Sequence, residues 1–197
     1  FNDIPPIKLL EQIYKNTFFY ILYFQKIGFP EKELENDREK SLRLIYCNSD
    51  AFGMKKMMCL ALTNNLNEKD KKSLFLEGMN EPKDLPSWLS NKDLKYFTKE
   101  FEKSGMFGPL NRYRCMDLDW KDLFKMSFDK IKKPSCFITG SLDPVNFFIP
   151  GVNLFDSVGG NYEDLRVKEQ LNDIGHWTQQ EAPDQVNKIL LDFLEKI

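Results

Sequence analysis

Two short segments of strand type near the C-terminal end constrain the fold most strongly. Residues 135–139 form an apolar run bounded by a proline and a glycine, and residues 165–171 alternate apolar and polar side chains. A helical pattern follows each segment, so the region predicts a β-α-β-α order typical of an α/β protein. Strands joined by a helical crossover are parallel, and parallel sheets normally contain more than two strands. We therefore expect further strands of this sheet to precede Phe1.

Helical signals dominate the chain before these strands. Ser90 and Asp93 have the spacing of a capping box, and Gly105 is expected to end the helix that they begin. The sequence therefore predicts two regions, a mostly helical one over residues 1–129 and an α/β one over residues 130–197.

Two stretches of the helical region have weaker patterns. Residues 31–46 are highly charged with a narrow apolar stripe, which predicts one surface helix. Residues 48–84 lack a clear period, and their polar part, residues 64–72, predicts a solvated loop.

Composition excludes several classes of protein. The chain has 28 basic and 30 acidic side chains and a net charge of -2, so nucleic acid is not an expected partner. The longest apolar run, residues 18–24, is far shorter than the roughly 20 residues of a transmembrane helix. No signal-peptide pattern opens the chain. The 4 cysteines lack the spacing of a zinc cluster or a disulfide framework, which favours reduced thiols and a cytoplasmic location.

Asp143 and His176 each follow a predicted strand. Ligands and catalytic groups in open α/β sheets lie at the carboxyl ends of strands. Because the chain has 1 histidine, any imidazole acid–base chemistry within it belongs to His176. A neighbouring carboxylate holds an imidazole in one tautomer and stabilises its charged form. Position alone leaves two simpler alternatives open, a turn aspartate and a structural histidine.

Tyr20 and Tyr113 are candidate hydrogen-bond donors. A phenol keeps its proton at neutral pH, so it can stabilise a developing alkoxide in a dry pocket. The chain has 7 tyrosines, so composition does not select these two. Aromatic packing is the simpler interpretation of either residue.

Longer motifs carry a resemblance to a known family. The stretch DLPSWLSNKDLKYFTKEFEKSGMFGPLNRYR, together with FFYILYFQKIG, resembles the lid of soluble epoxide hydrolases of the α/β-hydrolase superfamily. The segments FITGSLDPV and GHWTQQEAPDQVNKILLDFL are similar to the last third of that family's catalytic domain. The match is weakest over residues 48–80. It implies an α/β-hydrolase fold fragment, with a helical lid followed by the last β-α-β-α of the core sheet.

The resemblance also implies roles for single residues. Tyr20 and Tyr113 match the lid tyrosines that hydrogen-bond an epoxide oxygen, with Tyr23 as the competing choice for the first of them. Asp143 matches the acid that orients the histidine, and His176 matches the histidine that activates water. The aromatic residues implied to contact substrate are Phe19, Phe147, Phe148 and Trp177. No metal or organic cofactor is implied, and the implied partner is a small lipophilic epoxide, bound by a monomer or a homodimer.

One departure from the family pattern is large. The family's nucleophilic aspartate and its His-Gly-x-Pro oxyanion loop have no counterpart in these residues, and we expect both to precede Phe1. The implied reaction forms an aspartyl ester that an activated water then hydrolyses to a vicinal diol. The 197 residues alone are therefore expected to be inactive and poorly soluble.

Two other functions remain open from the sequence. A haloalkane dehalogenase-like hydrolase shares Asp143 and His176, although halides are usually held by tryptophan or asparagine rather than by a pair of tyrosines. A non-catalytic, truncated hydrolase that binds an apolar ligand or a partner is favoured by the missing nucleophile. Four matching catalytic positions argue against this second alternative.

Overall fold

The computed structural model of the chain describes residues 4–63, 73–125 and 130–197. By packing, these residues form two compact units, which are described separately. The described residues of unit 1 are 4–45, 73–85 and 90–125, and those of unit 2 are 46–63, 86–89 and 130–197. This division differs from the two continuous ranges expected from the sequence, because two stretches of the N-terminal half pack with C-terminal residues.

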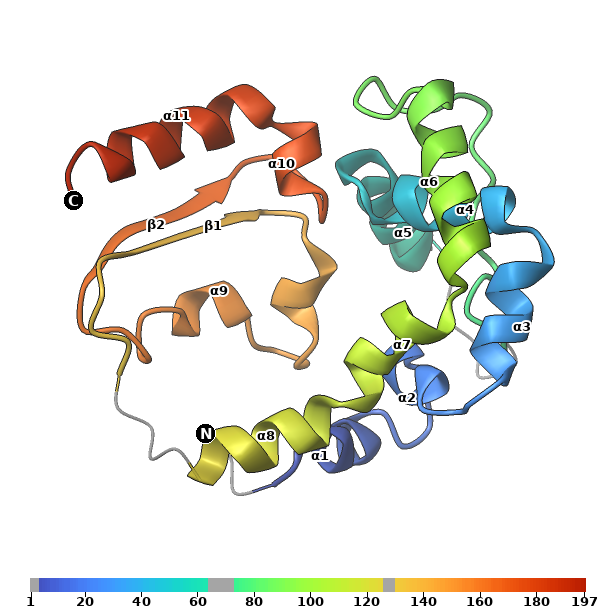
Figure 1. Cartoon of the computed structure of the whole chain (residues 1–197), viewed down its shortest axis with the longest axis horizontal. Helices are drawn as coiled ribbons and strands as arrows, with labels where there is room; N and C mark the ends of the chain where they lie inside the picture. The colour runs from blue at the N-terminus through green and yellow to red at the C-terminus, as the bar shows by residue number, and fades with distance from the viewer. Residues whose placement is uncertain (1–3, 64–72, 126–129) are drawn as a thin grey trace. The chain divides into compact units, whose positions relative to one another are not determined.

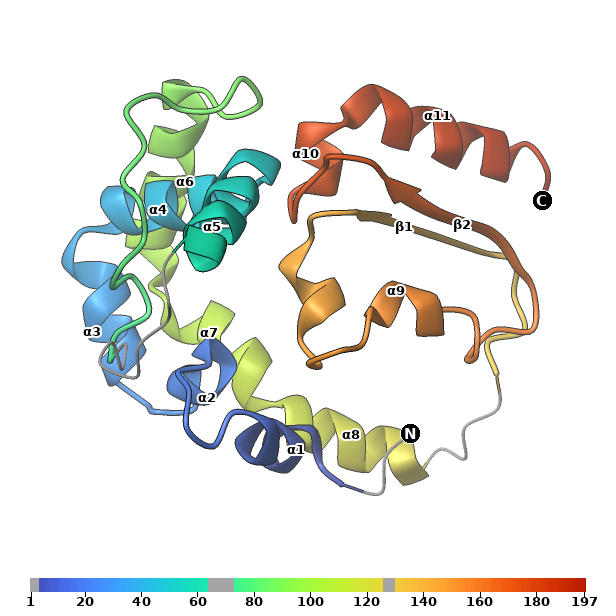
Figure 2. The ribbon, with the colours of Figure 1, turned by 180° about the vertical axis from the view of Figure 1, so that it is seen from behind.

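Unit 1 is helical (Figure 1). Its helices are α1 (Pro6–Ile13), α2 (Tyr20–Phe24), α3 (Phe29–Asn36), the first part of α4 (Arg38–Ser49), α6 (Asn91–Ser104), α7 (Phe107–Arg114) and α8 (Met116–Lys125). Helix α1 contacts α8, and α2 contacts α7, as both ribbon views show (Figures 1 and 2). The buried side chains of these helices include Ile21, Phe24, Leu34, Leu94 and Leu110. Burial of these apolar side chains stabilises helices that are too short to be stable alone.

Helix α6 begins and ends where the sequence predicts. The Asp93 backbone N–H donates to Ser90 Oγ at 3.1 Å, and the Ser90 N–H donates to the Asp93 carboxylate at 3.2 Å. This is the predicted capping box. Gly105 ends the helix at a φ of 67°, a left-handed value that favours glycine.

The prediction of one helix over residues 31–46 is wrong. The chain breaks at Asp37, whose extended backbone (φ -146°, ψ 91°) ends α3. Its Oδ1 then accepts the Lys40 N–H at 3.0 Å, which starts α4. Asp50 starts α5 (Ala51–Thr63) in the same way, since its Oδ1 accepts the Gly53 N–H at 2.7 Å.

Helix α5 lies in a stretch for which the sequence shows no clear period. Both helix starts therefore depend on a single aspartate cap, which the periodicity of the apolar residues does not record. The predicted loop at residues 64–72 falls outside the described residues.

Unit 2 contains the predicted strands. β1 (Ser135–Gly140) and β2 (Leu165–Leu171) are parallel neighbours, and Ile138 pairs with Glu169. The helices after them are the 3-10 helix η1 (Pro144–Phe147), α9 (Leu154–Ser157), α10 (Thr178–Glu181) and α11 (Pro183–Leu194). Both ribbon views place α9 and α11 on opposite sides of the sheet (Figures 1 and 2). The predicted β-α-β-α order is thereby confirmed.

The core of unit 2 lies between the sheet and α11. Leu171, Ala182 and Val186 are buried there, and half-buried isoleucines at 138, 174 and 189 pack against them. β1 is less covered than the buried strand that its apolar run predicts, because only Thr139 and Gly140 are buried. Several apolar side chains of α11 are exposed, Leu191 at 60% and Leu194 at 57% among them.

Two further expectations concern the whole chain. Among the described residues, no helix combines the length and the apolar character needed to cross a membrane. The four cysteines, all in described positions, carry thiols rather than disulfides.

Candidate active site

Asp143 and His176 are joined by a hydrogen bond in unit 2. His176 Nδ1 lies 2.9 Å from Asp143 Oδ1, the contact that the sequence predicts. Asp143 caps η1, and its Oδ1 also accepts the Val145 N–H at 3.0 Å. Thr139 Oγ1 donates to the other carboxylate oxygen at 3.4 Å. The hydrogen bonds from Thr139 and Val145 therefore fix the orientation of the carboxylate that contacts the imidazole.

The turn after β1 and the histidine loop (residues 172–177) are bonded to each other along their length. The Leu142 N–H donates to Ile174 O at 2.9 Å, and the Ser141 N–H donates to Leu171 O at 2.9 Å. The Asp173 N–H donates to Ser141 Oγ, also at 2.9 Å. Because the two strands are parallel, these turns leave the sheet at the same edge and bring Asp143 to His176.

Two glycines permit the close approach of the chain around His176. A Cβ at Gly140 would collide with the carbonyl oxygens of Ile174 and Gly175. A Cβ at Gly175 would lie 2.5 Å from the backbone nitrogen of Ala51. The histidine loop thus packs directly, backbone on backbone, against the end of β1 and the α4–α5 junction (residues 49–51).

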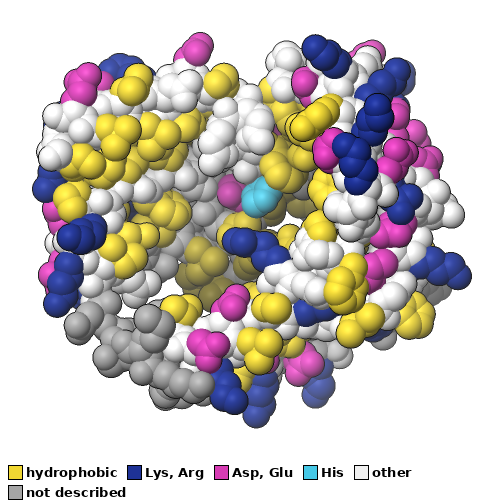
Figure 3. Space-filling view, viewed as in Figure 1, with side chains coloured by type: hydrophobic (Ala, Val, Ile, Leu, Met, Phe, Trp, Pro, Cys, Tyr) yellow, Lys and Arg dark blue, Asp and Glu magenta, His cyan; other side chains and the backbone are white. Residues whose placement is uncertain are grey.

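The electrostatics of the pair favour a charged imidazole. The hydrogen bond to Asp143 raises the pKa of His176, while partial burial acts in the opposite direction and the charge of Glu181 adds to the rise. The imidazole is 39% exposed and the Asp143 carboxylate 13% exposed. Figure 3 shows the one histidine of the chain, in cyan, at the molecular surface. The pair can therefore take up a proton from a water and hold the resulting charge.

Tyr20 and Tyr113 meet in unit 1. Their ring centroids are 5.7 Å apart with the planes at 83°. Burial raises the pKa of the Tyr113 phenol, and a hydrogen bond with Tyr20 acts in the opposite direction. Tyr23 lies elsewhere, 6% exposed and beside Phe18, where burial and the neighbouring Glu33 carboxylate raise its pKa. Of the two candidate tyrosines on α2, Tyr20 is the one beside Tyr113.

Polar bridges hold the two tyrosine helices together. Arg114 Nε donates to Phe24 O at 2.8 Å, and Gln25 Nε2 donates to Tyr113 O at 3.1 Å. Arg114 also forms an ion pair of 2.7 Å with Glu31, in which both side chains are largely buried. Arg114, the last residue of the NRYR motif, thus fixes α7, which carries one phenol, on α2, which carries the other.

The four residues predicted to contact substrate fall into different surroundings. Phe19 precedes Tyr20 in unit 1 and is 9% exposed, because its ring stacks on Tyr14 at 3.9 Å. In unit 2, Phe147 ends η1 and is 51% exposed, and Phe148 follows it. The ring centroids of Trp177 and His176 are 4.8 Å apart. Stacking leaves Phe19 less surface for a ligand than Phe147 has.

Sequence reasoning missed two polar residues that hold the segments around Asp143 and His176. Asn146 is buried at 5% exposed, and its Nδ2 donates to Gly140 O at 3.0 Å. Glu181 accepts backbone N–H groups on both sides of His176. The available signal for Glu181 is an acidic side chain five residues after the histidine, at the end of a short helix.

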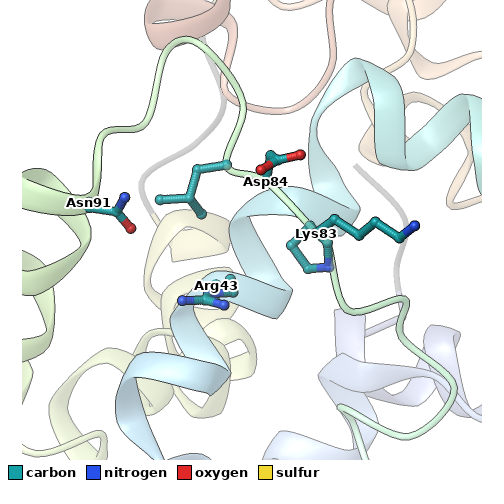
Figure 4. A pocket seen from close by; sticks show the side chains of 6 residues that line it. Arg43, Lys83, Asp84 and Asn91 are labelled. Atoms are coloured by element: carbon teal, nitrogen blue, oxygen red, sulfur yellow. The ribbon is translucent and has the colours of Figure 1, made fainter.

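Two cavities in unit 1 do not include the predicted site residues. One of about 110 Å³ is lined by Arg43, Pro82, Lys83, Asp84, Leu85 and Asn91 (Figure 4). In that view the Lys83 side chain extends away from the Arg43 guanidinium. The other, of about 320 Å³, lies between α3, α4 and residues 74–77. No group of three or more metal-ligating side chains occurs among the described residues.

Similar proteins were found among curated sequences. The chain is 31% identical over 192 residues to Epoxide hydrolase A of Mycobacterium tuberculosis, covering 98% of this chain and 56% of that protein. It is 30% identical over 196 residues to Bifunctional epoxide hydrolase 2 of Rattus norvegicus, covering 98% of this chain and 32% of that protein. The chain thus spans about half, or less, of the length of these relatives. No family model matches it.

Solved structures agree with these sequences. An epoxide hydrolase from an endophytic Streptomyces superposes with a TM-score of 0.83 at 31% identity, over 98% of this chain and 56% of that one. Epoxide Hydrolase A from Mycobacterium thermoresistibile superposes with a TM-score of 0.78 at 29% identity, over 98% and 57%. The predicted fold class is thereby confirmed: a helical region precedes part of an α/β-hydrolase sheet.

Proposed function

We propose that this chain, a homologue of epoxide hydrolases with their α/β-hydrolase fold, supplies the acid–histidine pair and the two phenols of an epoxide hydrolase. The observation that carries the proposal is the 2.9 Å bond between Asp143 and His176 after successive parallel strands. The contact between the Tyr20 and Tyr113 phenols, in the same chain, supports it. The substrate class is a small lipophilic epoxide, and the product is a vicinal diol.

The first step opens the ring. An aspartate carboxylate outside these 197 residues forms a C–O bond with one epoxide carbon, and the bond from that carbon to the ring oxygen breaks. The electron pair moves to the oxygen, which accepts hydrogen bonds from the phenols of Tyr20 and Tyr113 and then a proton from one of them, leaving that residue as a tyrosinate. A hydroxyalkyl ester of the enzyme results. The raised pKa of Tyr113 keeps its proton in place until the alkoxide forms.

The second step hydrolyses the ester. His176 Nε2 takes a proton from a water whose oxygen attacks the ester carbonyl carbon, while Nδ1 stays on Asp143. The tetrahedral intermediate collapses and expels the diol oxygen, which receives a proton from the imidazolium. The hydroxyl of the water stays on the aspartyl carbon, so the nucleophile is released as a carboxylic acid. Its proton passes through solvent to the tyrosinate left by the first step, and both groups are thereby regenerated. The bond that raises the pKa of His176 also makes it a stronger base.

The tyrosine pair separates this function from its nearest alternative. A dehalogenase-like enzyme needs no donor for an alkoxide, because the halide leaves as a stable anion. Two phenols in contact suit an oxygen that remains bound to the substrate carbon. The cytoplasmic location and the monomeric or dimeric state stay predictions.

The proposal is tested in the protein encoded by the complete reading frame that contains this chain. Stilbene oxide is converted to its diol by the wild-type protein and not by the His176→Gln variant. In a single turnover in ¹⁸O-labelled water, the diol carries no label and one enzyme carboxylate gains it, because the diol oxygen comes from the ester. Label in the diol at first turnover contradicts the ester. The 197 residues alone, without the nucleophile, are expected to give no diol.

A further inference from the structure

The carboxylate of Glu181 collects three backbone N–H groups in unit 2. Its Oε1 accepts the Trp177 N–H at 3.0 Å, and its Oε2 accepts the Gly175 N–H at 3.1 Å. Oε2 also accepts the Ala51 N–H, at the start of α5, at 2.9 Å. Two of the three donors are the residues on either side of His176. Bonds from N–H groups to a charged carboxylate are about twice as strong as those between neutral groups.

The backbone of His176 itself is also fixed. Its N–H donates to Ser49 O at the end of α4, 2.9 Å away. Three consecutive N–H groups, those of residues 175–177, therefore have defined acceptors, and Glu181 provides two of them. Trp177 adds a side-chain anchor, because its Nε1 donates to Tyr46 O at 2.9 Å.

Glu181 therefore acts on two elements at once. It ties the histidine loop to the N-terminal end of α5, where the backbone nitrogen of Ala51 approaches Gly175 too closely for a Cβ. It also places a negative charge whose field raises the pKa of His176, in addition to the larger contribution of Asp143. The three hydrogen bonds of Glu181 go to the main chain rather than to the imidazole, so its effect on the reaction passes through the loop and the field.

Other charged groups surround the histidine loop. They are Asp143 on the turn after β1, Asp50 at the α4–α5 junction, Glu181 on α10 and the exposed ion pair between Asp173 and Lys55. Of these, Asp143 and Glu181 act on the pKa of His176. Asp50 is 4% exposed, and burial raises its pKa, with the charge of Glu181 adding to the rise.

We propose that Glu181 is a positioning residue for His176: its carboxylate holds the main chain on both sides of the imidazole and locks the histidine loop to the α4–α5 junction, so that Nδ1 stays on Asp143 during ester hydrolysis. The proposal rests on the proposed function for its kinetic consequence. Its structural consequence, the ordering of the loop amides, is independent of that function.

The test compares Glu181→Gln with the matched control Asp184→Asn in the complete encoded protein. Glutamine keeps the size of the side chain but replaces one acceptor oxygen with a donor, so at least one of the three N–H groups loses its partner. Asp184 is an exposed carboxylate three residues further on, so its variant removes the same charge. Glu181→Asp keeps the charge and shortens the side chain, and it serves if the glutamine variant fails to fold.

The first readout is amide hydrogen exchange. In Glu181→Gln or Glu181→Asp, the Gly175 and Trp177 amides are expected to exchange at least about tenfold faster, while the Leu142 amide keeps its wild-type rate. The ¹H–¹³C signals of the His176 ring, assigned by their loss in His176→Gln, are expected to titrate at lower pH in Glu181→Gln than in Asp184→Asn. Unchanged amide exchange in both Glu181 variants overturns the proposal, whatever the enzyme's activity.

The second readout separates the two chemical steps. In Glu181→Gln, the rate of ester formation in a single turnover is expected to stay near the wild-type value, while ester hydrolysis slows about ten- to a hundredfold. A role confined to stability lowers both rates by the same factor, that of the folded fraction, and contradicts the proposal. If the wild-type protein forms no ester, the proposed function fails, and the amide exchange still decides the positioning role.

Discussion

The histidine loop of unit 2 and the tyrosine pair of unit 1 are held by different forces. Around His176 the contacts are directional: a carboxylate at 2.9 Å and backbone N–H groups with defined acceptors. Around Tyr20 and Tyr113 the contacts are mostly aromatic, with Phe24 5.1 Å from the Tyr113 ring and 5.4 Å from the Tyr20 ring. Polar bridges from Arg114 and Gln25 join the helices rather than the phenols.

This difference follows from what each group must do in the proposed reaction. A general base has to gain and lose a proton, so it needs a fixed tautomer and a nearby charge. A phenol that donates to an alkoxide has to keep its proton until the alkoxide forms, and burial among apolar rings raises its pKa and serves that purpose. Changes of charge should therefore affect the function of His176, and loss of a hydroxyl should affect that of the tyrosine pair.

Removing the charge of Asp143 is expected to have the largest effect among changes outside His176. Asp143→Asn should slow ester hydrolysis on the order of 10³-fold, because the imidazole loses its orienting partner. Since Asp143 raises the pKa of His176, its loss lowers that pKa, and the acidic limb of the pH–rate profile moves to lower pH. Pre-steady-state kinetics across pH measure both effects.

Asp173→Asn is the matched control for Asp143→Asn. Asp173 lies in the histidine loop at a φ of 60°, a value that asparagine also adopts, and its carboxylate is 74% exposed. Its variant should leave the acidic limb in place. An equal movement of the limb in both variants contradicts the pairing of Asp143 with His176.

Removing one phenol is expected to have the next largest effect. Tyr113→Phe should slow ester formation about 10²-fold, since one of two donors to the developing alkoxide is lost. Tyr23→Phe, on the same helix as Tyr20, should leave that rate unchanged because its ring packs beside Phe18. Single-turnover ester formation is the measurement. If the two variants slow ester formation equally, the contact between Tyr20 and Tyr113 does not identify the residues that donate to the alkoxide.

A methyl group at Gly175 tests the backbone packing of the histidine loop. Gly175→Ala places a Cβ 2.5 Å from Ala51 N and should destabilise the protein by about 1–3 kcal/mol. Gly160→Ala in the same unit meets its nearest atom at 3.7 Å and should cost under about 0.5 kcal/mol. Urea unfolding compares them. A similar midpoint for both variants means that the loop is not held in the close approach described here.

The smallest effect is expected from the cap of α6 in unit 1. Ser90→Ala removes the hydroxyl that accepts the Asp93 N–H and should cost about 1 kcal/mol of stability. Amide exchange should rise in the first turn of α6, with the histidine-loop amides unchanged. A rise at Gly175 and Trp177 as well indicates that the two regions respond as one, against the comparison drawn above.

The sequence predicts residues 130–197 of unit 2 better than the helices that precede them, for physical reasons. Alternation at residues 165–171 and the periodic α11 record burial on one face directly, and strand ends locate Asp143 and His176. Helix α4 begins at a single aspartate, Asp37, which also ends α3, and helix α5 begins in the same way at Asp50; neither cap leaves a periodic signal. The hydrophobic pattern therefore joins α3 and α4 into one helix and does not reveal α5, because it does not record the caps at which these helices begin.

The candidate site is only partly readable from local sequence. Seven tyrosines are available, and nothing in spacing or composition selects Tyr20 over Tyr23. The choice needs the family resemblance, and the 5.7 Å contact with Tyr113 agrees with it. Glu181 was missed because its partners are backbone N–H groups, one of them 130 positions away in the chain. Almost every residue has a backbone N–H, so a side chain that bonds to the main chain does not require a particular residue type in its partner. A sequence motif therefore does not reveal such a contact.

The most direct test of the account is the mass of His176→Gln after exposure to an excess of stilbene oxide. The account predicts that ester formation proceeds and hydrolysis stops, because the chain holds 1 histidine and no second imidazole in it can replace the base. The complete encoded variant protein should gain the mass of one epoxide molecule and keep it through desalting. An unmodified variant that still turns over the epoxide at the wild-type rate would contradict the assignment of His176 as the base.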